Sequence, residues 1–92
     1  MTHEVRFSRK SQTDLISIYD YIAKQSDASR ALAYVERIRD FCLSLNQFPE
    51  RGTSWDHVLR GIRVVGFERR VSIAFRIKTH TVTVVRILYG GK

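Results

Sequence analysis

The sequence predicts an α+β fold in the order β-α-α-β-β-β, with a helical hairpin packed on one face of an antiparallel sheet. Three observations predict it. Apolar residues recur at helical spacing over residues 15–45 and alternate at strand spacing over residues 62–88. Between the two regions lies the segment 48–52, in which Pro49 cannot continue a helix and Gly52 favours a turn. A chain of 92 residues has room for one small core, so we expect a single domain over residues 1–92.

The first two elements are a short strand and a helix. Val5 and Phe7 alternate with polar neighbours over residues 4–8, a pattern typical of an edge strand. Ser8 and Ser11 are both candidates for the N-cap of the helix that follows. Four residues then recur at helical spacing and predict a first helix to about Lys24: Leu15, Ile18, Tyr19 and Ile22.

A second helix follows after a short break. Asp27 is a suitable N-cap, and five apolar residues step by four, three, four and three: Ala31, Val35, Ile38, Cys42 and Leu45. The short connection predicts an antiparallel hairpin. Cys42 is the only cysteine, so an internal disulfide is excluded and a reducing compartment is expected. Its place in the apolar stripe indicates a buried small hydrophobic residue.

Three strands are predicted over residues 62–67, 71–78 and 82–88, joined by hairpin-sized connections at 68–70 and 79–81. In the middle strand Val71, Ile73, Phe75 and Ile77 share one face. We expect an antiparallel meander whose inner face is covered by the helices and whose other face, or its rim, carries charge. Residues 53–60 are expected to form a loop that Trp55 anchors to the core, and the alternative is a binding role for Trp55.

The positive charge is concentrated in the last third of the chain. Residues 60–92 hold eight Lys/Arg and one acid, whereas residues 1–59 sum to zero, so the net charge of +7 lies in the predicted meander. Such a surface favours a negatively charged partner, either nucleic acid or an acidic protein. Arginines near Tyr89 would suit phosphodiester chemistry, because arginine holds phosphate and tyrosine can transfer a proton. The alternative is that the arginines only keep the protein soluble while Tyr89 packs on the sheet.

Several classes of site find no support in the sequence. His3, His57 and His80 are far apart in sequence and only one cysteine is present, so no metal site is expected. No glycine-rich phosphate-binding spacing occurs, and we expect no cofactor. No apolar run reaches the roughly 18 residues that a membrane span needs, and no signal peptide is recognisable. A cytoplasmic protein without a membrane partner is therefore expected.

Five segments, taken in order, resemble the RelE/ParE superfamily of toxins from bacterial type II toxin–antitoxin pairs. They are S-R-K-S-Q-T-D-L-I-S-I-Y-D-Y-I from Ser8 onward, F-P-E-R-G at 48–52, G-I-R at 61–63, F-E-R-R-V-S-I-A-F-R at 67–76 and V-R-I-L-Y-G at 85–90. No single segment is specific, but their order and spacing together are. F-P-E-R-G, G-I-R-V and the ending V-R-I-L-Y-G-G are more similar to the ParE side.

The resemblance implies one of two activities. A ParE-like toxin inhibits DNA gyrase, is not an enzyme, causes growth arrest and serves plasmid stabilisation. A RelE-like toxin is an endoribonuclease that cuts messenger RNA on the ribosome, and its catalytic residues here would be Arg70, Arg86 and Tyr89. Many relatives carry histidine where this chain has Tyr89, and a tyrosine with a pKa near ~10 is a poor base. A third possibility is an attenuated toxin that acts mainly in its antitoxin complex and in operon autoregulation.

All three functions imply a hetero-oligomer with a ParD-like antitoxin, whose disordered acidic segment would fold on binding. The residues expected to bind the target or nucleic acid are Arg63, Arg69, Arg76 and Lys78. The residues expected to line the antitoxin groove are Tyr19, Tyr34 and Phe41. The alternative for these three aromatic residues is that they complete the hydrophobic core.

Overall fold

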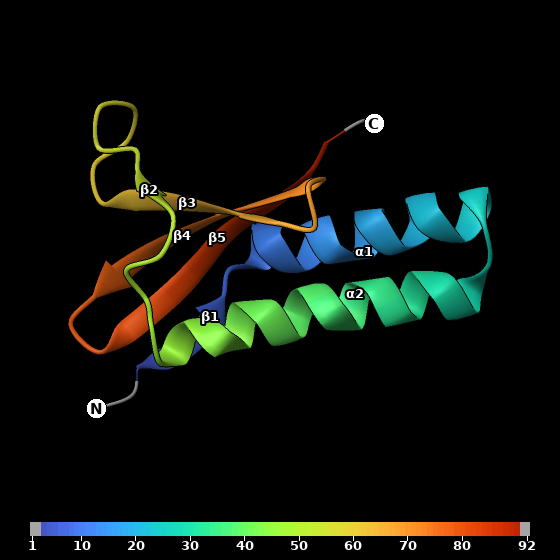
Figure 1. The fold of residues 1–92 in the computed structure, drawn as a ribbon, viewed down its shortest axis with the longest axis horizontal. Helices are drawn as coiled ribbons and strands as arrows, with labels where there is room; N and C mark the ends of the chain where they lie inside the picture. The colour runs from blue at the N-terminus through green and yellow to red at the C-terminus, as the bar shows by residue number, and fades with distance from the viewer. Residues whose placement is uncertain (1–2, 91–92) are drawn as a thin grey trace.

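The computed structural model, which describes residues 3–90, has a helical hairpin on one face of a five-stranded sheet (Figure 1). The strand order is β1-β5-β4-β3-β2. The elements are β1 (Glu4–Phe7), α1 (Arg9–Gln25), α2 (Ala28–Leu43), the 3-10 turn η1 (Ser44–Asn46), β2 (Thr53–Ser54), β3 (Ile62–Phe67), β4 (Val71–Lys78) and β5 (Thr81–Tyr89). The predicted α+β order is confirmed, and β3 and β4 have the predicted bounds.

Polar caps start both helices. Ser8 is the N-cap of α1, because its Oγ accepts a hydrogen bond from the N–H of Ser11 at 3.0 Å. Ser11, the other candidate, is buried inside the helix, where its hydroxyl donates to the Ser8 carbonyl at 2.8 Å. Asp27 caps α2 as predicted, accepting from the N–H of Arg30 at 2.8 Å. Figure 1 shows that the connected ends of the two helices project beyond the sheet.

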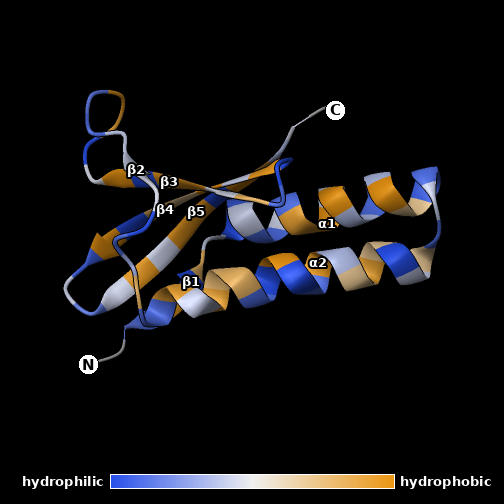
Figure 2. Ribbon diagram, viewed as in Figure 1, coloured by the Kyte–Doolittle hydropathy of each residue, from blue (hydrophilic) through white to orange (hydrophobic). Residues whose placement is uncertain are grey.

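The core lies between the hairpin and the inner face of the sheet. Its buried members from the helical part are Leu15, Ile18, Ile38, Cys42 and Leu45. Its buried members from the sheet are Val71, Ile73, Phe75, Val82, Val84 and Ile87. Figure 2 shows the corresponding alternation of hydrophobic and hydrophilic residues along the helices. The predicted inner face of β4 and the predicted burial of Cys42 are both confirmed.

β1 is an edge strand, as predicted, and it pairs with β5 in parallel while the other strand pairs are antiparallel. The β4–β5 ladder is interrupted opposite Ala74 and Phe75. Ala74 pairs with Arg86 and Phe75 pairs with Val84, which leaves Val85 as the extra residue of a β-bulge. The bulge turns Arg86 to the outer face and Ile87 to the core.

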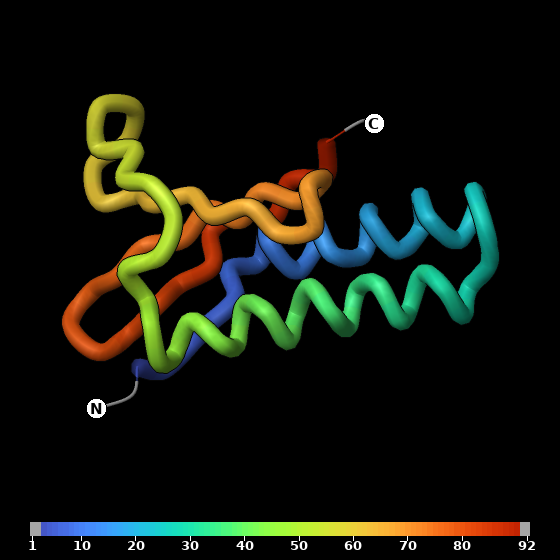
Figure 3. Tube along the Cα trace, viewed as in Figure 1, coloured from blue at the N-terminus to red at the C-terminus, as the bar shows by residue number. Residues whose placement is uncertain are grey.

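The segment predicted as a loop over residues 53–60 differs in two respects. Its first two residues form β2, a short strand that pairs with Arg63 and Val64 of β3. The expectation that Trp55 anchors the segment to the core is wrong, because Trp55 is 42% exposed and lies outside the core cluster. Two hydrogen bonds to the Trp55 carbonyl, from the N–H groups of Val58 and Leu59, close a tight turn. These backbone groups are therefore paired within the segment itself. Figure 3 shows this turn projecting away from the helices.

No helix within residues 3–90 is long and apolar enough to cross a membrane.

Candidate functional site

The fold brings together two of the residues predicted from sequence, Arg70 and Tyr89. Val71 pairs with Tyr89 across the β4–β5 ladder. The carbonyl of Arg70 accepts a hydrogen bond from the N–H of Gly90 at 2.5 Å, so the β3–β4 turn is tied to the end of β5. Residues 70 and 89 are therefore neighbours although 18 residues separate them in the chain.

Tyr89 lies in a cluster of three tyrosines. Its ring centroid is 5.7 Å from that of Tyr21 on α1 and 6.0 Å from that of Tyr34 on α2. These are the distances of favourable tilted and edge-to-face aromatic contacts. Tyr21 was not predicted as a site residue, although it lies three residues after the buried Ile18 and so belongs near the same helical face. We name Tyr21, Tyr34 and Tyr89 the tyrosine cluster.

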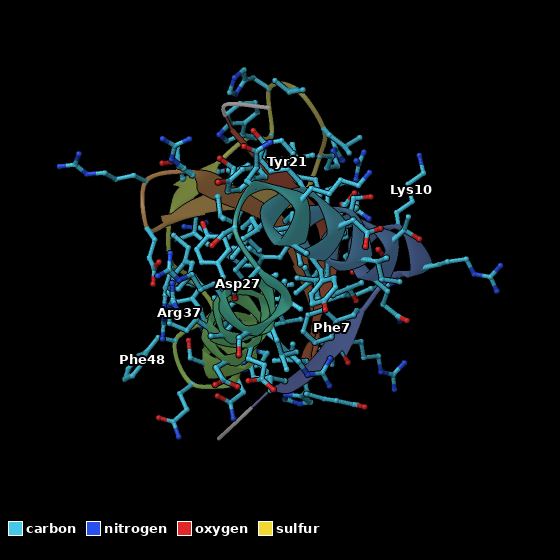
Figure 4. All side chains as sticks on the ribbon, turned by 90° about the vertical axis from the view of Figure 1, so that its right-hand side faces the viewer. Phe7, Lys10, Tyr21, Asp27, Arg37 and Phe48 are labelled. Atoms are coloured by element: carbon cyan, nitrogen blue, oxygen red, sulfur yellow. The ribbon has the colours of Figure 1, made fainter. Side chains whose placement is uncertain are left out.

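An ion pair closes one side of the tyrosine cluster. Arg37 donates from Nε and Nη2 to the two carboxylate oxygens of Glu68, at 3.0 Å each. The same guanidinium lies over the ring of Tyr34, 5.1 Å from its centroid. Figure 4 shows Arg37 on the opposite side of the helical hairpin from Phe7. The hydrogen bond from Arg37 lowers the pKa of Glu68, so this carboxylate stays ionised and accepts hydrogen bonds only.

The tyrosine next to this ion pair is held in its neutral form. Burial raises the pKa of Tyr34, and the nearby Tyr89 and Glu68 raise it further. Its hydroxyl is therefore a hydrogen-bond donor at neutral pH rather than a base. Within residues 3–90, the tyrosine cluster thus has arginines beside it, but its adjacent carboxylate is already engaged. The arrangement can bind an anion or stack on a planar group. Neither Glu68 nor Tyr34 is suited to remove a proton at neutral pH.

Arg86, the third predicted catalytic residue, is bound to α1. Its Nε and Nη2 donate to the two carboxylate oxygens of Asp14 at 2.8 and 3.1 Å. Burial alone would raise the pKa of Asp14, but the hydrogen bonds from Arg86 and from the N–H of Ile87 lower it overall. Asp14 raises the pKa of Arg86 in turn. Arg86 therefore fixes the position of β5, and its donors that face Asp14 are occupied.

The four arginines and lysines predicted to contact a target fall into two groups. Arg63 donates to three backbone carbonyls of the turn before β2, those of Arg51 at 3.0 Å, Gly52 at 3.3 Å and Glu50 at 3.4 Å. Arg76 is half-buried, and its side chain lies beside Gly61. The exposed members are Arg69 and Lys78, which lie at opposite ends of β4, roughly 25–30 Å apart along the strand. The structure places the available charge on the rim of the sheet.

The centre of the outer sheet face is apolar. Val64, Ala74, Val85 and Leu88 of the sheet and Trp55 of the β2–β3 connection line a pocket of about 320 Å³, which we name the outer-face groove. Val58 and Leu59 on its border are more than half exposed. Of the two positions expected for the charge, the rim is therefore the one the structure supports. The outer-face groove is therefore a candidate binding surface.

The three aromatic residues predicted to bind antitoxin are all half-buried. Tyr34 and Phe41 pack against the core cluster, and the Phe41 ring centroid is 4.9 Å from that of Phe67. Tyr19 is not among the residues packed against that cluster. Tyr34 and Phe41 therefore complete the core while keeping part of their surface accessible. A role for the three residues in antitoxin binding remains a prediction.

Comparison with known proteins agrees with the observed fold. The family described as "ParE toxin of type II toxin-antitoxin system, parDE" matches residues 5–92. The chain is similar to a solved structure of the chromosomal ParDE toxin–antitoxin system from P. aeruginosa, with 27% identity, a TM-score of 0.84 and 97% of each chain covered. No curated protein shows a significant match.

Two further solved structures share the fold at lower identity. The toxin–antitoxin complex RelBE2 from Mycobacterium tuberculosis matches with 19% identity and a TM-score of 0.74, covering 97% of this chain and 99% of that one. The conserved hypothetical protein HP0894 from Helicobacter pylori matches with 13% identity and a TM-score of 0.56, covering 95% and 93%. At these identities the similarity shows the fold alone.

Proposed function

Because this chain belongs to the ParE toxin family of type II toxin–antitoxin systems, we propose that it is a ParE-like toxin that inhibits DNA gyrase and is neutralised by a ParD-like antitoxin. Its site of action would be the cytoplasm, where gyrase works. In this function the protein binds its target and catalyses no reaction. The similarity to a ParDE system at 27% identity supports the antitoxin partner.

The observation that carries the choice of gyrase over messenger RNA is the state of the groups around Tyr89. An endoribonuclease needs a general base and a general acid positioned at the scissile phosphate. Glu68 is engaged by Arg37, and Tyr34 is held neutral, so neither is suited to remove a proton at neutral pH. Arg86 is bound by Asp14. These contacts support a surface that binds rather than cleaves.

One observation favours the second candidate, a ribosome-dependent endoribonuclease. Arg70 and Tyr89 are brought together from distant parts of the chain, as such a site would require. In that function Arg70 would bind the phosphate and Tyr89 would transfer a proton.

The outer-face groove supports the antitoxin part of the proposal. Its lining is mostly apolar, and Arg76 lies nearby on β4. An amphipathic segment with acidic residues along one side would complement both features. We propose that such a segment of the antitoxin binds in this groove.

Two measurements test the function. Purified protein is added to a gyrase supercoiling assay, and labelled amino acid incorporation is followed for the first minutes after induction in cells. We expect loss of supercoiling, continued protein synthesis and a DNA damage response. The variants Arg70→Ala and Tyr89→Phe are compared with Lys24→Ala, which removes an exposed cation in the last turn of α1.

A rapid collapse of protein synthesis that both variants abolish and Lys24→Ala does not would establish the endoribonuclease instead. Absence of both effects would identify an attenuated toxin, whose role is in its antitoxin complex.

A further inference from the structure

Local hydrogen bonds hold the connection between β2 and β3 in one shape. We name its residues 55–61 the projecting turn. At its base the N–H of Trp55 donates to the Ile62 carbonyl at 2.8 Å. Inside it the Asp56 carboxylate accepts from the N–H of Gly61 at 2.7 Å, and Gly61 has a φ of +81°, which favours glycine. Because residues 55–61 lie outside the core cluster, these bonds fix the turn from within.

The projecting turn presents apolar side chains to solvent. Val58 is 64% exposed, Leu59 is 52% exposed and Trp55 is 42% exposed. Figure 3 shows that the turn stands away from the helices, and Figure 2 shows that part of it is hydrophobic. Large apolar side chains gathered at the surface mark a contact site for another molecule. A turn that is already ordered loses little conformational entropy on binding, which favours such a contact.

The charge around the projecting turn is positive overall. Arg60 is exposed within it, and the half-buried side chain of Arg76 lies beside Gly61. Asp56 is the one carboxylate of the turn, and it already accepts the hydrogen bond from Gly61. Carboxylates at the border of an apolar pocket on a partner would therefore complement the two arginines.

The composition of the projecting turn favours a protein partner over nucleic acid. Val58 and Leu59 are aliphatic, so they can neither stack on a base nor bind a phosphate. Surfaces that bind nucleic acid depend on phosphate contacts and on aromatic stacking. Apolar and aromatic anchors bordered by arginine are instead typical of contacts between proteins.

We infer that the projecting turn is the element through which this toxin contacts its protein target. Trp55, Val58 and Leu59 would enter an apolar pocket of the target that carboxylates border. This inference rests on the proposed function, in which the target is gyrase. The same three side chains line the outer-face groove. Antitoxin bound in that groove would cover them, so the toxin could not contact gyrase through them at the same time.

A pair of matched variants tests the apolar contact. The affinity of Leu59→Glu for purified gyrase holoenzyme is compared with that of Leu32→Glu, because Leu32 is also 52% exposed but lies on α2. Leu59→Glu should weaken binding by about tenfold or more, since its carboxylate would enter an apolar pocket with an acidic border. Leu32→Glu should change the affinity by less than about twofold. Urea denaturation checks that both variants fold.

A second measurement keeps every side chain of the contact nearly unchanged. Trp55 is the only tryptophan of the chain, so its fluorescence reports on the projecting turn. Replacing it with 5-hydroxytryptophan gives a fluorophore that can be excited at wavelengths at which tryptophan absorbs little. Quenching of this fluorophore by acrylamide should fall at least about twofold when gyrase is added, because the anchors of an interface are shielded from solvent.

The outcomes separate the inference from the function on which it rests. If the toxin binds gyrase but Leu59→Glu behaves like Leu32→Glu, or if Trp55 stays accessible to acrylamide, the inference is wrong and the proposed function stands. If the wild-type toxin does not bind gyrase, both fail. Protection of Trp55 by duplex DNA without gyrase would identify nucleic acid as the partner, which also overturns the inference.

Discussion

Asp14 on α1 binds Arg86 on β5 through both carboxylate oxygens, and its Oδ2 also accepts from the N–H of Ile87 at 2.8 Å. This contact lies on the part of β5 beyond its pairing with β1. β1 pairs with β5 only as far as Val84, and beyond it the Ser8 hydroxyl donates to the Val85 carbonyl at 2.8 Å. The side chains of Ser8 and Asp14 therefore form hydrogen bonds with backbone groups of β5 at Val85 and Ile87, in the part of the strand that leads to Tyr89.

The first prediction concerns the stability that this contact contributes. Asp14→Ala removes the acceptor for three hydrogen bonds and should lower the free energy of unfolding by about 1–3 kcal/mol. Urea denaturation measures it. Glu4→Ala, which removes an exposed ion pair with Arg6, is the control and should cost clearly less. Equal losses in the two variants would contradict a structural role for Asp14.

The second prediction concerns pH. The pKa of Asp14 is lower in the folded state than its unfolded value near ~3.9, so its contribution is fully present above that value and is lost as the pH falls through the folded pKa. The stability difference between wild type and Asp14→Asn should be constant above about pH 5 and should shrink below about pH 4. Thermal melts across this range measure it, and a difference that grows on acidification would contradict the assignment.

The third prediction concerns Gly52, which has a φ of +73°. A Cβ at this position would lie 2.2 Å from the Val64 carbonyl oxygen, in a backbone region that other residues rarely adopt. Gly52→Ala should therefore cost more than about 1 kcal/mol of stability. Gly66→Ala is the control, since its Cβ would meet only an ordinary contact at 3.8 Å. A Gly52→Ala variant as stable as Gly66→Ala would show that the β2–β3 pairing adapts at little cost.

The fourth prediction concerns Cys42. Burial raises the pKa of its thiol to about 12, and its side chain is not accessible to solvent. Because the thiolate is the reactive form, the native protein should resist a thiol reagent such as DTNB at pH 8. Reaction should follow unfolding in urea. Rapid labelling of the native state would show that the helical hairpin opens away from the sheet.

The fifth prediction concerns Trp55 in the outer-face groove. Trp55→Ala should weaken antitoxin binding by about tenfold or more, because large aromatic residues dominate binding surfaces. It should change the free energy of unfolding little, since Trp55 lies outside the core. Titration calorimetry and urea denaturation of the same variant separate these effects. A large loss of stability with unchanged affinity would place the role of Trp55 in folding.

Local patterns predicted most of the elements. The alternation of Val71, Ile73 and Phe75 predicted the inner face of β4, and Asp27 was recognisable as a helix cap. These features depend on neighbours in sequence, which is why periodicity and capping rules find them. The adjacency of Arg70 and Tyr89 is an observation of the structure, in which Val71 pairs with Tyr89. The contribution of Tyr21 to their surroundings was not predicted, because it depends on how α1 packs on β5.

By itself, the sequence determined the order of elements, the residues of the inner core, the caps and the excess of positive charge in the last third of the chain. Only the tertiary structure decided which of those charges are available. Arg63 and Arg86 look like free surface cations in the sequence, yet one binds the carbonyls of the Glu50–Gly52 turn and the other binds Asp14. The reason is physical: periodicity records which face a residue occupies, whereas the partner of a long charged side chain depends on segments that meet only after folding.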